Sequence, residues 1–173
     1  MVITQGVQVT GRCSACGGTT TCDVGQFFDN GMLCWGTEGQ CADCPNGWCE
    51  QDSGPVTPES IRQALLQAHG AARLRLSEDT PNLVPVLQAL RRARDMPLAE
   101  ARTLATRLTE TGLVGTLVEM EILAVHLRQR AVAVSVEPVA RLASDAGGVP
   151  GLPRDEGAAA GVCLLAVERE CDG

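Results

Sequence analysis

Apolar residues recur at helical spacing in four stretches between residues 57 and 130, which predicts four helices. Thr57-Pro58-Glu59 is a typical helix start, because an N-cap residue, a proline at the first helical position and an acid in the first turn all favour it. The four expected helices run from Thr57 to Gly70, from Asp79-Thr80-Pro81 to the Met96-Pro97 break, from Leu98 to Gly112 and from Glu119 to Arg130.

Three strands are expected between these helices. Leu74 and Leu76 alternate with arginines, Leu113 to Val118 forms a second apolar run, and alternating valines form a third that stops at Pro138. After the first helix the order is strand, helix, helix, strand, helix, strand. This order predicts an α+β fold in which a three-stranded antiparallel sheet packs on three helices.

The first 56 residues have a different pattern, rich in Gly, Thr and Cys, with Val7 and Val9 alternating. We expect short strands around metal-binding turns, and too few large apolar residues for an ordinary core. Metal binding would then supply much of the folding free energy of this segment.

Changes in composition divide the chain into three parts. Residues 1–56 are expected to form a small Cys-rich, zinc-ribbon-like module, and 57–142 the α+β domain. Residues 143–173 are expected to be a linker of Gly, Ala and Pro followed by Val162 to Val167, either as a docking strand or as a tail.

Four of the nine cysteines form two pairs, Cys13-Ser-Ala-Cys16 and Cys41-Ala-Asp-Cys44. A pair with two residues between its members presents both sulfurs to one ion from a tight turn. Two such pairs complete a tetrahedral thiolate site, so the sequence predicts a structural zinc ion held by these four residues. Gly17 and Gly18 fit the first turn, because glycine tolerates a positive φ that points backbone N–H groups at sulfur.

The other five cysteines leave alternatives open. Pro45 removes an N–H donor from the second turn, so Cys34 or Cys49 is an alternative ligand in place of Cys41 or Cys44. Cys22, Cys34 and Cys49 are either small buried residues or a second metal or redox site. Cys163 and Cys171 lack metal spacing and are interpreted as incidental.

Composition and charge indicate where the protein is located and which partners are disfavoured. The 173 residues contain no apolar run of membrane-spanning length, and the first twelve lack a secretory pattern, so we expect a cytoplasmic protein with reduced thiols. Residues 1–56 hold one Arg against six acids, and zinc thiolates would add further negative charge. Such a module repels phosphate backbones, which disfavours nucleic acid as a partner.

The element order and the run from Leu87 to Arg102 resemble the C-terminal domain of the bacterial ribosomal stalk protein and the fold of the Clp-protease adaptor for N-terminal degrons. The likeness covers about residues 71–138 and rests on Leu98-Ala-Glu-Ala-Arg102, the Gly112 turn and the alternating valines. Cys13 to Gly17 resembles a zinc-ribbon turn. The resemblance implies that this segment has the same fold. The lysines of the stalk domain and the Asn-Asp turn of the adaptor have no counterpart in this sequence.

No phosphate loop, nucleophile elbow or paired-carboxylate motif occurs, and His69 and His126 lack catalytic neighbours. Arg91, Arg92, Arg94, Arg102 and Arg107 form either a basic face for an acidic partner or a solvated helix surface. We therefore expect a non-enzymatic zinc-binding protein that acts through an unidentified protein partner. The alternative is a thiol- or metal-handling, redox-responsive protein that uses the surplus cysteines.

Overall fold

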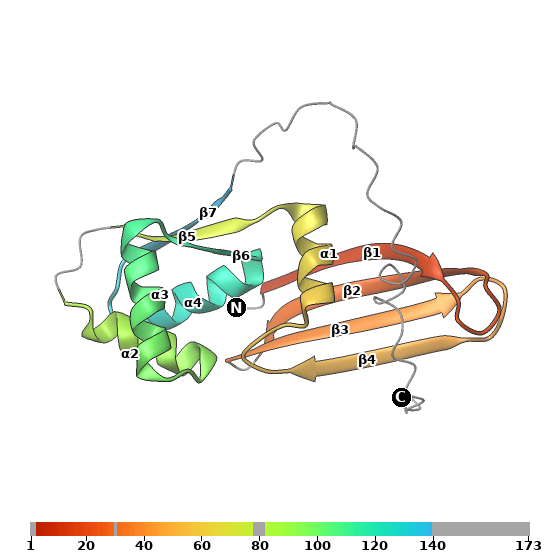
Figure 1. The fold of residues 1–173 in the computed structure, drawn as a ribbon, viewed down its shortest axis with the longest axis horizontal. Helices are drawn as coiled ribbons and strands as arrows, with labels where there is room; N and C mark the ends of the chain where they lie inside the picture. Colours follow the sequence, from red (N-terminus) through yellow and green to blue (C-terminus); the bar gives the residue numbers. More distant parts are fainter. Residues whose placement is uncertain (1–2, 30, 78–81, 140–173) are drawn as a thin grey trace.

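The computed structural model describes residues 3–29, 31–77 and 82–139. Its first part is a four-stranded antiparallel sheet in which each strand pairs with the next along the chain. The strands are β1 (Ile3–Arg12), β2 (Thr19–Asp29), β3 (Met32–Cys41) and β4 (Gly47–Ser53). They are longer than expected, and they form one elongated, gently twisted sheet (Figure 1).

The second part follows the expected element order. Its elements are α1 (Glu59–His69), β5 (Ala72–Leu76), α2 (Val84–Arg94), α3 (Leu98–Glu110), β6 (Leu113–Gly115), α4 (Leu117–Arg128) and β7 (Val134–Pro138). Strand β5 lies between β6 and β7 and pairs antiparallel with both. The α+β class and the three-stranded sheet packed on three helices are confirmed. The expected helix start at Asp79-Thr80-Pro81 lies outside the described residues.

The core of this second part is aliphatic. Leu74 on β5, Leu90 on α2 and Leu127 on α4 are fully buried in it. Strand β6 is shorter than expected, because Thr116 ends it and begins α4. The Thr116 side chain accepts a hydrogen bond from the Glu119 N–H, and the Glu119 carboxylate accepts one from the Thr116 N–H, which makes a capping box.

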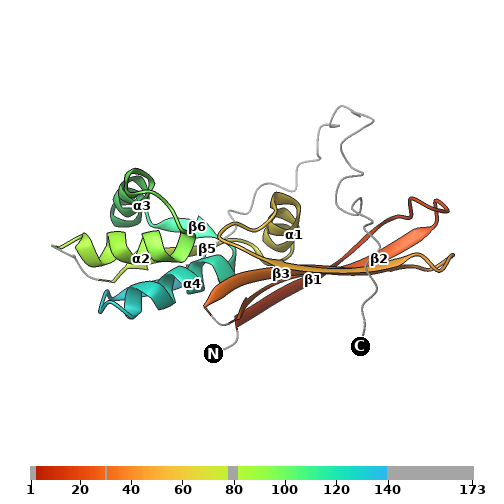
Figure 2. The same ribbon diagram turned by 90° about the horizontal axis from the view of Figure 1, so that it is seen from below.

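Helix α1 packs on the four-stranded sheet (Figure 2). Ile61 and Leu65 form an apolar cluster there with Cys22, Val24 and Trp35. The first segment therefore does not rely on its own apolar residues alone, because a helix beyond residue 56 supplies the other apolar face of this cluster. The expected boundary falls in the connection between β4 and α1, and α4 also contacts the first sheet.

The described helices are also short. None of them is both long enough and apolar enough to cross a membrane. The expected linker and tail at 143–173 lie outside the described residues.

Candidate metal centre

The two cysteine pairs occupy two turns at the same end of the four-stranded sheet. Cys13 and Cys16 lie in the turn between β1 and β2, and Cys41 and Cys44 lie at the turn between β3 and β4. Strands β2 and β3 are neighbours, with Thr20 opposite Cys41, so their register sets the two turns side by side. Figure 1 shows this end of the sheet pointing away from α2, α3 and α4.

The four sulfurs form one compact group. All four Sγ atoms lie within 4.8 Å of one another. The Sγ atoms of Cys13 and Cys44 are 3.7 Å apart, and those of Cys16 and Cys41 are 3.5 Å apart. A tetrahedral zinc ion with Zn–S bonds of about 2.3 Å requires sulfurs roughly 3.8 Å apart. The donor set and its dimensions therefore fit a soft divalent ion.

Each turn is closed by the same backbone hydrogen bond. The N–H of Cys13 donates to the carbonyl of Gly18, and the N–H of Cys41 donates to that of Asn46, both at 2.8 Å. In the first turn the Gly18 N–H donates to Cys16 Sγ at 3.4 Å, and Gly17 adopts a φ of 73°. The expected positive φ is confirmed at Gly17, where it lets the N–H of the following residue point at sulfur.

In the second turn Pro45 has no N–H to donate, and neighbouring groups donate to the sulfurs instead. The Asp43 N–H donates to Cys41 Sγ at 3.4 Å, and the side-chain amide of Asn46 donates to Cys13 Sγ at 3.4 Å. Asn46 therefore supports a sulfur of the opposite turn. Sequence reasoning missed this residue, and its only signal is an amide side chain two positions after the second pair.

Asp43 ties the two turns together from outside the sulfur cluster. Its carboxylate accepts a hydrogen bond from the Thr19 N–H at 3.1 Å. A Cβ atom at Gly18 would collide with this carboxylate, so the absence of a side chain at Gly18 leaves room for Asp43. A hydrogen bond outside the cysteine cluster thus holds the two turns together.

Hydrogen bonds and neighbouring thiols shift the pKa values of three of these cysteines in different directions. The Asn46 amide, with further help from the Cys16 N–H, lowers the pKa of Cys13 to about 6. The Gly18 N–H lowers the pKa of Cys16, but the thiols of Cys44 and Cys41 have the opposite effect. The net result is a pKa raised to about 12. Hydrogen bonds from Asn46 and Cys16 lower the pKa of Cys44, yet burial and the neighbouring thiols leave it raised. Such crowded sulfurs ionise together when a cation compensates their charge.

The remaining described cysteines lie outside this cluster. Cys22 and Cys34 are buried, and Cys49 is exposed on β4 opposite Glu38. Within the described residues, the group formed by Cys13, Cys16, Cys41 and Cys44 includes neither of the alternative ligands Cys34 and Cys49. Cys163 and Cys171 lie beyond the described part of the chain.

The two histidines also stand apart from the sulfur cluster. His69 is exposed, and its Nε2 lies 2.7 Å from the carbonyl oxygen of Gly6. His126 is buried in α4, where burial, with Arg130 and Arg92, lowers its pKa. The described residues therefore offer a thiolate site without imidazole.

Comparison with known proteins adds no relative. No protein-family model, curated protein or solved structure matches the chain.

Proposed function

We propose that this chain holds one structural zinc ion through Cys13, Cys16, Cys41 and Cys44. The observation that carries the proposal is the clustering of their four Sγ atoms within 4.8 Å. Four sulfur donors favour zinc or an iron–sulfur centre. We favour zinc, because two pairs of this spacing on β-turns are typical of structural zinc sites.

The ion would clip one hairpin of the sheet to the next. Each hairpin contributes two sulfurs, so a bound ion crosslinks the β1–β2 turn to the β3–β4 turn. The α1 cluster already supplies an apolar core to the sheet, so the effect of zinc on stability would be concentrated at the end of the sheet. This end would become a rigid platform.

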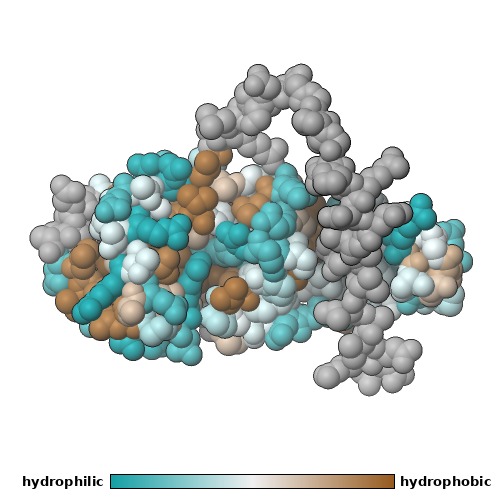
Figure 3. Space-filling model, in the orientation of Figure 1, coloured by the Kyte–Doolittle hydropathy of each residue, from teal (hydrophilic) through white to brown (hydrophobic). Residues whose placement is uncertain are grey.

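We further propose that the protein acts through protein–protein interaction rather than catalysis. Leu83, Val84 and Leu98 are exposed large apolar residues at the starts of α2 and α3, and Figure 3 shows apolar patches over this half of the molecule. Arg91 and Arg92 are also exposed, in the last turn of α2. A mixed apolar and basic helical surface suits an unidentified protein partner with apolar and acidic groups. The stalk-like element order is compatible with this role.

Partner recovery with matched variants tests the interaction. Proteins crosslinked to the full-length chain in its host cytoplasm would be compared for wild type, Leu98→Glu and Thr103→Glu. Leu98 and Thr103 are both exposed on α3, and only Leu98 belongs to the apolar set. The proposal expects one partner that wild type and Thr103→Glu retain and Leu98→Glu loses. An identical set of crosslinked proteins for all three chains would contradict it.

A second candidate function is metal handling or redox response. One observation favours it: Cys16 is exposed, so solvent and exchanging ligands reach one sulfur of the cluster. Exchange of bound zinc for isotopically labelled zinc separates the candidates. A single ion that exchanges over many hours supports the structural role, and two or more rapidly exchanging ions support metal handling.

A further inference from the structure

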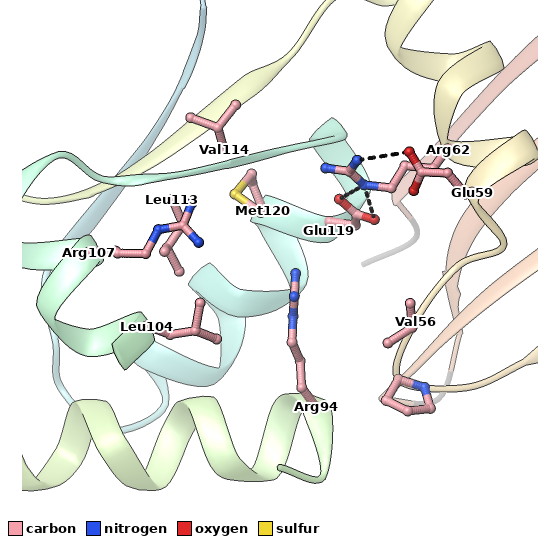
Figure 4. Close-up of a pocket in the computed structure, with 11 residues that line it drawn as sticks. Val56, Glu59, Arg62, Arg94, Leu104, Arg107, Leu113, Val114, Glu119 and Met120 are labelled. Carbon is pink, nitrogen blue, oxygen red and sulfur yellow. Dashed lines mark hydrogen bonds and ion pairs between the residues drawn. The ribbon is translucent and has the colours of Figure 1, made fainter. Parts of the chain in front are cut away.

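A cleft of about 290 Å³ opens where the two halves of the molecule meet. Its walls come from α1 and the segment before it on one side, and from α2, α3, β6 and α4 on the other (Figure 4). Three arginines from three different helices line it: Arg62 on α1, Arg94 on α2 and Arg107 on α3. Figure 4 shows their guanidinium groups around a shared opening.

The buried carboxylate of this cleft is already engaged. Arg62 Nε donates to both carboxylate oxygens of Glu119, at 3.1 and 3.2 Å. Glu119 also accepts the Thr116 N–H at 3.0 Å as part of the α4 capping box. The negative charge of Glu119 is therefore matched by Arg62 and by the start of α4. The second lining carboxylate, Glu59, is mostly exposed and lies 3.8 Å from Arg62 Nη1, so solvent screens it.

Arg94 is the more buried of the two lining arginines whose side chains pair with no described residue, the other being Arg107. Arg94 is the last residue of α2 and is half-buried, and no described residue accepts a hydrogen bond from its side chain or forms a close ion pair with it. Burial lowers the pKa of Arg94, Glu119 opposes this change, and Arg62 adds to it. A guanidinium stays charged and offers five N–H donors. A partly desolvated cation without a partner is costly, so an anion at this position would be favoured.

The size and walls of the cleft indicate the ligand class. Its volume is close to the lower end, roughly 300 Å³, of small-molecule sites. Val56, Leu104 and Met120 give it apolar walls beside the arginines. The planar guanidinium matches the oxygens of a carboxylate or phosphate in a bidentate manner. We propose that this cleft binds a small molecule through its carboxylate or phosphate group, with Arg94 as the main donor and Arg107 as the second.

This proposal gives Arg94 a role different from that of its neighbours. Arg91 and Arg92 are exposed on the same helix, while Arg94 turns into the cleft toward Glu119. The sequence groups the three as one basic face. In the structure, only Arg94 of the three lines the cleft.

Titration of the full, metal-loaded chain by NMR tests the proposal. Inorganic phosphate and malonate are added separately, with chloride removed to keep ionic strength constant. We expect saturable shifts of the backbone amides of Arg94, Leu104 and Met120 with at least one of them. The tighter probe identifies the preferred anionic group.

Two variants and one control make the result specific. Arg94→Gln should weaken binding about tenfold, the order expected for a lost charge-assisted hydrogen bond. Arg107→Gln removes the second donor and should also weaken binding. Because Arg107 is exposed, this change should have little effect on folding. Arg92→Gln removes the same charge from α2 outside the cleft and should bind as wild type does.

Several outcomes would overturn the inference. They are the absence of saturable shifts with both probes, shifts confined to residues outside the cleft, and equal weakening by Arg92→Gln and Arg94→Gln. Metal content is measured on the same samples. A negative titration on metal-loaded protein therefore rejects the anion site and leaves the zinc proposal standing.

Discussion

Gln26 and Thr116 form a buried hydrogen bond between the two halves of the molecule, although 90 positions separate them in the chain. The Thr116 hydroxyl donates to Gln26 Oε1, and Gln26 Nε2 donates to the hydroxyl of Thr57. Gln26 is 0% exposed, Thr116 is 1% exposed and Thr57 is 2% exposed. Because Thr116 also caps α4, this network joins the first sheet, the segment before α1 and the start of α4.

Replacing Gln26 should therefore destabilise the protein. Gln26→Leu removes one hydrogen bond from each of two buried threonine hydroxyls, which costs about 1–3 kcal/mol of unfolding free energy. Gln63→Leu is the matched control, because Gln63 is exposed and, within the described residues, its side chain bonds to Glu59 of the same helix. It should change the free energy by less than about 0.5 kcal/mol. Urea unfolding measures both, and equal effects would show that the network adds nothing.

Removal of the metal should loosen one end of the sheet and leave the rest folded. The apolar core of α2, α4 and β5 and the cluster beneath α1 do not include the four cysteines of the site. After chelation, backbone amides at 13–18 and 41–46 should exchange with deuterium faster, while those of α2 and α4 keep their protection. Hydrogen-exchange mass spectrometry reads both regions at once. Loss of protection throughout the chain would contradict this division.

Asn46→Ala should weaken metal binding without removing a ligand. The Asn46 amide donates to Cys13 Sγ and is the main cause of the lowered pKa of that thiol. Losing such a supporting partner reduces metal affinity roughly 10–100-fold. Competition with a chromophoric chelator measures the change, and Asn82→Ala, far from the cluster in sequence, is the control. If both variants bind as wild type does, the Asn46 contact has no supporting role.

Metal binding should release protons, and its affinity should rise with pH. At pH 7.5 Cys13, with a pKa of about 6, is already a thiolate. Cys16, with a pKa of about 12, and Cys44, whose pKa is raised, still carry protons. Binding then displaces at least the protons of these two thiols, and below about pH 6 the proton of Cys13 as well.

Calorimetry in buffers of different ionisation enthalpy counts these protons. The Cys49→Ser variant should release the same number, because Cys49 is not a member of the cluster. Binding without proton release, or affinity that falls as pH rises from 6 to 8, would rule out coordination by these thiols.

The local features of the fold could be read from the sequence, because their causes are local. Helical spacing of apolar residues identifies α1 and α3, and alternation identifies β5 and β7. The spacing within each cysteine pair was equally informative, because one turn positions both sulfurs. The apolar run predicts a strand from Leu113 to Val118, but the strand ends at Gly115, because Thr116 is the N-cap of α4.

The features that depend on contacts between distant segments could not be read in this way. Ile61 and Leu65 looked like one face of a helix, and nothing local showed that this face covers Trp35 and Val24. Asn46 reaches Cys13 only because the register of β2 and β3 brings the two turns together. Gln26 is a polar residue in a strand, and its buried partner lies 90 positions away.

The most direct test of the central proposal is the metal content of the full chain, purified without oxygen or chelator and measured by native mass spectrometry. We predict one zinc ion per chain in wild type and in Cys49→Ser, and its loss in Cys16→Ser, which removes one member of the cluster. Thiol labelling of the same samples should find the four clustered cysteines protected. A wild-type chain without metal, or a Cys16→Ser chain that retains it as tightly as wild type, would contradict the proposed centre.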